Sequence, residues 1–226
     1  MSETPDLLPF EHDAYQVRSP QVLLIAPLEE GRKQAARVVE LFDVSRWVVF
    51  CNKTDEKSEV NTEAYDFWAE KLGSGLAVHD GLKNLESVMQ FQKKKSHLYR
   101  SEKQLFPQKY KLGLIFEGLS RGKSDLIEDL MCNARFYHII PIILTSYPRS
   151  LSPAVRCNVD YLFCGSRSMS KLGIIYDSLL GEPNTLKEFL QLTNQAETKN
   201  SWLVLDNTVR GGNAFSLWSL DGHRPV

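Results

Sequence analysis

Short apolar runs alternate with longer amphipathic segments along most of the chain. Each run is continuous rather than alternating, which is typical of β-strands that are buried on both faces of a sheet. The predicted strands are residues 22–26, 46–52, 112–116, 139–145, 159–165, 202–207 and 214–220.

The segments between these runs carry helical spacing. In residues 31–42, the apolar side chains fall at intervals that place them on one face of a helix. A second, long amphipathic helix is predicted from Asp80 to Tyr99, and its stripe includes either Phe91 or Gln92. Shorter helices are predicted at residues 64–72, 124–137, 153–158, 168–180 and 185–196.

Strands that alternate with helices predict an α/β fold with right-handed crossovers, in which helices flank a mainly parallel sheet. The last two strands lack a helix between them and predict a C-terminal β-hairpin that turns at Gly211, Gly212 and Asn213. Residues 1–20 contain three prolines and no periodic pattern, so we expect a flexible arm, followed by a single domain over residues 21–226.

Composition excludes several classes of protein. The 226 residues are 42% hydrophobic and 24% charged with a net charge of −1, so binding to nucleic acid requires a local patch. No apolar stretch reaches the roughly 18 residues that span a membrane, and the acidic N-terminal residues do not resemble a signal peptide. The cysteines form no CxxC pair and predict reduced thiols rather than a zinc site. We therefore expect a soluble protein from a reducing compartment, with no membrane partner.

A Gly-Lys-Ser triplet follows the run at 112–116. A phosphate-binding P-loop needs four residues between its first glycine and this triplet, but Gly118 to Ser124 leaves only three. The position four before Gly122 is Glu117, whose carboxylate would repel phosphates. A nucleotide-binding enzyme that uses the Gly118–Ser124 loop stays open as an alternative.

The segment after the first strand keeps the full P-loop spacing. Arg32 falls where the phosphate-binding lysine would be, and Lys33 falls where the Mg²⁺-binding hydroxyl would be. Glu29 and Glu30 fill positions that usually hold small residues, which is unfavourable beside phosphates. The predicted nucleotide-binding residues are Ala26, Pro27, Gly31, Arg32 and Lys33.

The run at 112–116 then occupies the place of the Walker B strand. Glu117 stands where an acid would coordinate Mg²⁺, while Gly118 replaces the acid that would activate water. The alternative is that Glu117 only ends the strand.

The order of these segments resembles the viral genome-packaging ATPases of the poxvirus type, in the FtsK–HerA superfamily of P-loop NTPases. Further segments that resemble the family are residues 80–95, 130–146, 150–163 and 201–208, of which "PAVRCNVDYLF" is the most specific. The resemblance covers roughly residues 20–210 and implies a RecA-like parallel sheet.

The resemblance also implies roles for single residues. Glu117 would be catalytic and would bind the metal, Arg135 would reach a neighbouring subunit's nucleotide, and Ser146 replaces a sensor glutamine. Arg156 is a second candidate for phosphate or subunit contact, with a surface ion pair as its alternative. Because the Walker motifs are degraded, we expect weak or lost ATP hydrolysis, with ATP and Mg²⁺ as cofactors only if nucleotide binding is retained.

A basic stretch follows the long helix's midpoint. The predicted DNA-binding residues are Lys93, Lys94, Lys95, Arg100 and Lys103, and aromatic residues lie between and after them. The alternative is a solvated helix end. The resemblance implies double-stranded DNA, a homo-oligomeric ring or an active packaging ATPase paralogue, and capsid or portal components as partners, in the host-cell cytoplasm, viral factory or virion. A non-catalytic virion or replication accessory scaffold is the alternative function.

Overall fold

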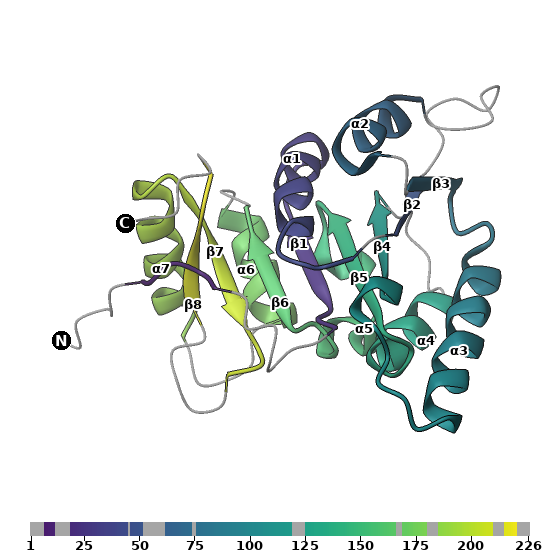
Figure 1. The fold of residues 1–226 in the computed structure, drawn as a ribbon. Helices are drawn as coiled ribbons and strands as arrows, with labels where there is room; N and C mark the ends of the chain where they lie inside the picture. Colours follow the sequence, from purple (N-terminus) through teal and green to yellow (C-terminus); the bar gives the residue numbers. More distant parts are fainter. Residues whose placement is uncertain are drawn as a thin grey trace.

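The computed structural model describes residues 7–11, 19–44, 46–51, 62–73, 76–118, 125–165, 169–179, 185–209 and 215–220. Its centre is an eight-stranded sheet in the order β3-β2-β4-β5-β1-β6-β7-β8 (Figure 1). The strands are β1 (Val22–Ile25), β2 (Trp47–Cys51), β3 (Leu76–Asp80), β4 (Leu112–Glu117), β5 (Ile139–Thr145), β6 (Tyr161–Cys164), β7 (Ser201–Asp206) and β8 (Phe215–Ser219). In this order, all strands from β3 through β1 to β6 run parallel to one another, whereas β7 runs antiparallel to β6 and β8 runs antiparallel to β7. The predicted α/β fold is confirmed, and β7 and β8 pair as predicted, while the predicted turn at Gly211, Gly212 and Asn213 lies outside the described residues.

Helices cover both faces of the sheet. They are α1 (Leu28–Val39), α2 (Thr62–Leu72), α3 (Leu85–Ser101), α4 (Asp125–Asn133), α5 (Pro153–Cys157), α6 (Met169–Leu179) and α7 (Leu186–Thr198), with short 3₁₀ helices η2 (Gln108–Tyr110), η3 (Ala134–Tyr137) and η4 (Pro148–Ser150). Helices α1 and α2 pack on one face, and α3 to α7 pack on the other (Figure 1). None of the helices in the described residues is long and apolar enough to cross a membrane.

Alternation along the strands divides the core into two layers. In β1, Val22 and Leu24 face α1, whereas Leu23 and Ile25 face the helices of the opposite layer. All four side chains are fully buried, which explains the continuous apolar run in the sequence.

Two predicted helix starts are wrong. The long helix begins at Leu85 rather than Asp80, because residues 76–80 form the unpredicted edge strand β3. Its buried stripe includes Gln92, and Phe91 is exposed. Helix α1 begins at Leu28 rather than residue 31, so the connection after β1 is shorter than expected.

Part of the predicted N-terminal arm is packed against the sheet. Pro9 bridges Leu217 in β8, and the Phe10 backbone N–H donates to the Leu217 carbonyl at 2.7 Å. The Phe10 ring contacts Tyr161, with its centroid 5.0 Å away, and also packs on Trp218. The segment therefore covers the outer edge of β8.

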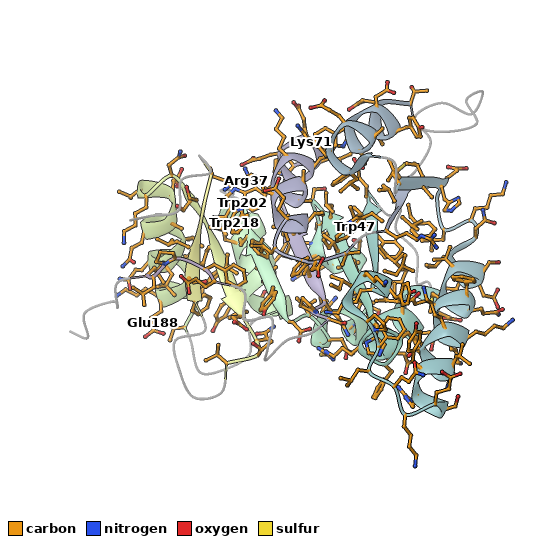
Figure 2. The ribbon with its side chains drawn as sticks, in the orientation of Figure 1. Arg37, Trp47, Lys71, Glu188, Trp202 and Trp218 are labelled. Carbon is orange, nitrogen blue, oxygen red and sulfur yellow. The ribbon has the colours of Figure 1, made fainter. Side chains whose placement is uncertain are left out.

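The C-terminal hairpin is tied to α1. Figure 2 shows Arg37, Trp202 and Trp218 gathered between α1 and this hairpin. Arg37 lies over the Trp218 ring at 5.0 Å and donates to the Ser219 carbonyl, while Trp218 donates to Gln34 at 3.0 Å. These contacts fix the position of α1 over the sheet.

Candidate functional site

The carboxyl ends of β1, β5 and β4 lie side by side. Ile25 pairs with Thr145, and Glu117 pairs with Leu144 across β5. The Ala26 backbone N–H continues the ladder by donating to the Thr145 carbonyl at 3.1 Å. This is the edge at which open α/β sheets bind ligands. The predicted residues Ala26, Glu117 and Ser146 are therefore brought to one edge, with Ser146 exposed.

The connection between β1 and α1 is too short to form a phosphate-binding loop. Only Ala26 and Pro27 separate the strand from the helix. The Gly31 backbone N–H already donates to the Pro27 carbonyl at 2.8 Å, so residues 28–31 form the first helical turn. A phosphate nest needs consecutive backbone N–H groups that all point toward one place. In this turn the Gly31 N–H instead points along the helix axis, to the Pro27 carbonyl.

The two glutamates of this turn are directed away from a common centre. Glu29 pairs with Lys33 at 3.2 Å on the exposed surface, four residues apart on the helix. The Glu30 carboxylate accepts a hydrogen bond from Trp202 at 3.2 Å. Lys33 thus faces solvent rather than the edge of the sheet.

Arg32 and Glu117 form a buried ion pair. The Arg32 Nε donates to Glu117 Oε1 at 2.5 Å, and a second guanidinium nitrogen contacts the same carboxylate. Arg32 is 6% exposed and Glu117 is 2% exposed. The two residues come from α1 and β4, and they meet across the end of β5. Arg32 stands at the predicted position of the phosphate-binding lysine, and Glu117 stands at that of the Walker B acid. The charges at these two positions therefore neutralise each other.

Side chains of helix α2 cover this ion pair. Glu63 accepts from Arg32 Nη1 at 2.6 Å, and Trp68 Nε1 donates to the second oxygen of Glu117 at 3.0 Å. The Phe67 ring lies 5.6 Å from the Arg32 guanidinium. Trp68 is fully buried, whereas the Glu63 side chain is largely exposed. We refer to Arg32, Glu63, Trp68 and Glu117 as the Arg32–Glu117 network.

The network favours the charged form of Arg32. Burial lowers the pKa of Arg32, but hydrogen bonds from the guanidinium to Glu63 and Glu117 outweigh it, and the net shift is upward. Nearby, burial and then the charge of Glu117 raise the pKa of the Cys51 thiol to about 11. Cys51 is therefore a neutral thiol and no nucleophile at physiological pH.

This arrangement does not fit a Mg²⁺-bound nucleotide. One oxygen of Glu117 is held by Arg32 and the other by Trp68, so neither is directed at a metal. Position 33 lacks a hydroxyl, and the Arg32 guanidinium is already shared by two carboxylates. Among the described residues, no group of three or more His, Cys, Asp or Glu side chains could hold a metal ion. The Gly118–Ser124 loop lies, apart from Gly118, outside the described residues.

Arg135 lies at the opposite edge of the sheet, where strands β1 and β6 begin. Its guanidinium pairs with Asp160 at 2.6 Å, and the other Asp160 oxygen accepts from the Gln21 backbone N–H at 2.8 Å. It cannot reach Glu117 in its own chain. A role toward a neighbouring subunit stays a prediction. Arg156 donates to the Leu151 carbonyl at 2.5 Å within the η4–α5 segment.

The basic stretch is only partly free to meet a ligand. Lys95 lies 3.7 Å from the centre of the Tyr110 ring, and Lys93 lies 5.5 Å from that of Tyr137. Arg100 donates to the Phe136 carbonyl, and the side chains of Lys93, Lys94, Arg100 and Lys103 are all exposed. The aromatic residues that follow in the sequence pack on one another, as in the Tyr99 and Phe106 rings, 5.3 Å apart, and Phe106 also stacks on His138 at 4.1 Å. They are therefore poor candidates for stacking on bases.

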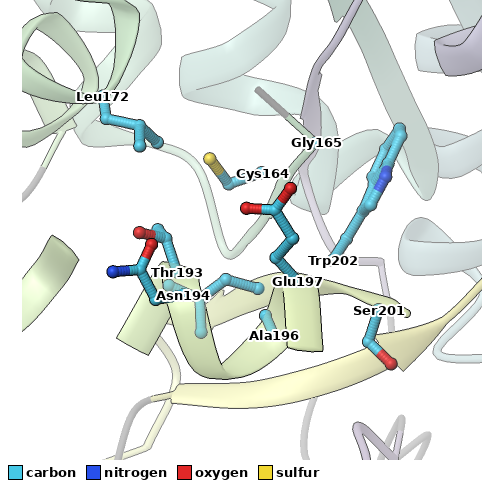
Figure 3. Close-up of a pocket in the computed structure, with 10 residues that line it drawn as sticks. Cys164, Gly165, Leu172, Thr193, Asn194, Ala196, Glu197, Ser201 and Trp202 are labelled. Carbon is cyan, nitrogen blue, oxygen red and sulfur yellow. The ribbon is translucent and has the colours of Figure 1, made fainter. Parts of the chain in front are cut away.

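A small pocket lies at the end of β6, between α6, α7 and β7 (Figure 3). Its lining includes Cys164, Asn194, Glu197 and Trp202, with the Glu197 carboxylate directed into it. A volume of about 40 Å³ holds a few water molecules and no nucleotide.

No protein-family model and no curated protein matches the chain. Solved structures do match. The genome packaging NTPase B204 from Sulfolobus turreted icosahedral virus 2, in complex with AMPPCP, superimposes with a TM-score of 0.55 at 15% identity, over 88% of this chain and 97% of that one. The DNA-packaging ATPase B204 from Sulfolobus Turreted Icosahedral Virus gives 0.54 at 13%, over 88% and 97%.

EssC (ATPases 2 and 3) from Geobacillus thermodenitrificans gives a TM-score of 0.57 at 8% identity, over 90% of this chain and 40% of that one. The similarity covers 88–90% of this chain in all three structures, which are of viral and bacterial proteins. The chain therefore shares the mostly parallel α/β fold of these solved ATPases.

Proposed function

We propose that this chain is a genome-packaging ATPase-like protein that has lost ATP hydrolysis and acts as a non-catalytic subunit on double-stranded DNA. The observation that carries the proposal is the Arg32–Glu117 network. The positions that would bind phosphate and Mg²⁺ in an active P-loop enzyme are joined into a buried ion pair.

ATP hydrolysis would require the hydrogen bonds and ion pairs of the Arg32–Glu117 network to break. Glu117 would have to release Arg32 and Trp68 before it could ligand a metal, and the buried charges would lose their compensation. Gly118 offers no carboxylate to activate water, and Ser146 replaces the sensor amide. We therefore expect the chain to bind neither ATP nor Mg²⁺ at this site, and binding of either would overturn the proposal.

The DNA part of the proposal is supported by the fold and by the charge of α3. The similar viral proteins are named as DNA-packaging and genome-packaging enzymes. Lys94 and Arg100 on α3, and Lys103 just beyond it, are all exposed, and their positive charge suits the phosphate backbone. Such a subunit would work in a homo-oligomeric ring or beside an active paralogue, and would contact capsid or portal components in a viral factory, the host-cell cytoplasm or the virion.

The test is equilibrium binding of a fluorescent ATP analogue, with and without Mg²⁺, to the wild type, Arg32→Ala and Lys123→Ala. We expect no saturable binding to any of them at high micromolar protein. Binding that only Arg32→Ala abolishes would show that the first-strand site still takes nucleotide. Binding that only Lys123→Ala abolishes would place a nucleotide on the Gly118–Ser124 loop. Circular dichroism of each variant checks that the fold is kept.

DNA binding separates the proposal from a scaffold that acts only through proteins. Salt-dependent binding of a blunt duplex, weakened by glutamine at Lys94 and Lys103, is the expected result. Absence of binding at low salt would leave the accessory scaffold as the better description.

A further inference from the structure

Phe136 carries an exposed aromatic side chain next to a helix that is rich in cations. It belongs to η3, and its side chain leaves the residue 60% exposed although its neighbour Ala134 is fully buried. The backbone of Phe136 is fixed from α3, since Ser96 Oγ donates to its carbonyl at 2.9 Å and Arg100 Nη2 does so at 3.3 Å. The ring is thus presented to solvent from a firmly held position.

Two cations lie along the face of α3 that contacts η3. Lys93, Ser96 and Arg100 share a helix face that is directed at η3, and the two cations lie about 10 Å apart along the helix axis. Lys93 sits on the Tyr137 ring, next to Phe136 in the chain. We call Lys93, Arg100, Phe136 and Tyr137 the α3–η3 seam.

The charges of the seam are not compensated by acids. Within the part of the chain that the structure describes, neither Lys93, Lys94 nor Arg100 forms an ion pair with a carboxylate. By contrast, Arg32 and Arg135 are both paired. Positive charge without a local partner attracts polyanions, and here it is combined with an open aromatic face.

From this combination we infer that the α3–η3 seam binds nucleic acid at an unpaired base, with the base stacked on Phe136 and the flanking phosphates on Lys93 and Arg100. An aromatic ring stacks on any base, but the face of a base is accessible only where the strand is single or frayed. The seam would therefore favour a single-stranded tail or end over an uninterrupted duplex. The inference rests on the nucleic-acid part of the proposed function and adds the strand state that is recognised.

The chain contains a matched control for Phe136. Phe91 lies on α3 and is 59% exposed, so its loss removes the same kind of side chain from a similar environment. It is two residues from Lys93, which places it about 200° around the helix and away from η3.

The experiment measures fluorescence anisotropy with a blunt duplex and with the same duplex carrying a single-stranded thymine tail. The proteins are the wild type, Phe136→Ala, Phe91→Ala and Arg100→Gln. We expect the tail to increase wild-type affinity, Phe136→Ala to lower affinity for the tailed duplex about ten-fold without affecting the blunt one, and Phe91→Ala to change neither. Arg100→Gln should weaken both and reduce the dependence on salt.

Each other outcome overturns a different part. If no DNA binds, the proposed function fails together with the inference. If the duplex binds but the tail adds nothing, or Phe91→Ala matches Phe136→Ala, the inference alone fails. If Phe136→Ala changes the oligomeric state in size-exclusion chromatography with light scattering and leaves DNA affinity unchanged, the seam is a contact between copies of the chain.

Discussion

Replacing Arg32 with alanine would leave the Glu117 carboxylate without its cationic partner in a site that is 2% exposed. The guanidinium makes a two-nitrogen contact with this carboxylate, and no other cation contacts Glu117 in the hydrogen bonds and ion pairs of the described residues. Glu63→Gln is the matched control, because it removes the other carboxylate that Arg32 contacts, at a position whose side chain is 72% exposed.

The expected losses differ because the two pairs differ in burial. Removing one member of a buried ion pair costs about 3–5 kcal/mol of unfolding free energy. The Trp68 hydrogen bond to Glu117 persists in the variant and compensates part of the loss, so we expect about 3 kcal/mol for Arg32→Ala. The exposed Glu63 contact is screened by water, and its loss should cost less than about 1 kcal/mol.

Equilibrium urea denaturation, followed by tryptophan fluorescence, measures both variants against the wild type. A lower midpoint with an unchanged slope would report a change in stability rather than in the compactness of either state. The double variant Arg32→Met with Glu117→Gln removes both charges and keeps an acceptor for Trp68. It should recover more than half of the loss, since an uncharged pair has little desolvation cost.

If Arg32→Ala lies within about 1 kcal/mol of the wild type and equals Glu63→Gln, the pair is solvated and contributes like a surface contact. The Arg32–Glu117 network would then be no barrier to a metal or a phosphate at Glu117. The site would then not be closed by its own side chains.

Three further predictions concern other parts of the molecule. Gly165→Ala should lower the melting temperature, at a cost of about 1–3 kcal/mol, because the added Cβ would stand 2.3 Å from the Trp202 ring. Gly173→Ala, with nothing within 4 Å, should not lower it, and equal losses in thermal unfolding would contradict the overpacking argument. At about pH 8, a thiol reagent should label the exposed Cys132 and Cys157 in the native protein and spare Cys51, whose pKa burial raises to about 11. Mass spectrometry of the labelled sites checks this pattern, and labelling of Cys51 ahead of Cys132 and Cys157 would contradict it. Hydrogen bonds from Thr185, first from its backbone N–H, lower the pKa of Glu188. A lowered pKa stabilises the fold above the group's ordinary pKa, and this contribution is lost as the pH falls through the native value. Glu188→Gln should therefore lower the melting temperature at neutral pH and have little effect in strong acid.

Most of the sheet could be predicted because its central strands are buried on both faces. β1, β4 and β5 are continuous apolar runs, and such runs carry a strong signal. β3 carries a weak one, because an edge strand with partly exposed side chains, "LAVHD", has neither a buried run nor a strict alternation. The helical pattern therefore takes in only Asp80, and residues 76–79 carry no predicted element.

The start of α1 shows how one signal can hide another. Pro27 before the helix, with Glu29 and Glu30 in the first turn, is a helix-start pattern. The P-loop spacing of the same residues suggested a loop instead. A phosphate nest needs small residues that leave the backbone free, and two glutamates in a row favour the helix.

The candidate site was predictable only in part. Arg32 and Glu117 were both identified by their positions relative to the strands, and both lie at the edge where the motif places them. Glu63 and Trp68 carry no motif, and Trp68 meets Glu117 from 49 residues away in the chain. That contact depends on how α2 packs, which a local pattern does not specify.

The contact of Leu7–Phe10 with β8 has a consequence for the order of folding. The bridge between Pro9 and Leu217 joins residues from nearly opposite ends of the described chain, and a contact of such long range is slow to form. During synthesis, Phe10 leaves the ribosome long before β8 exists, so its ring has no Trp218 to pack on until β8 has been made. The outer edge of β8 is therefore covered by a segment that was made much earlier, and until β8 emerges that segment is free to pair with another nascent chain instead.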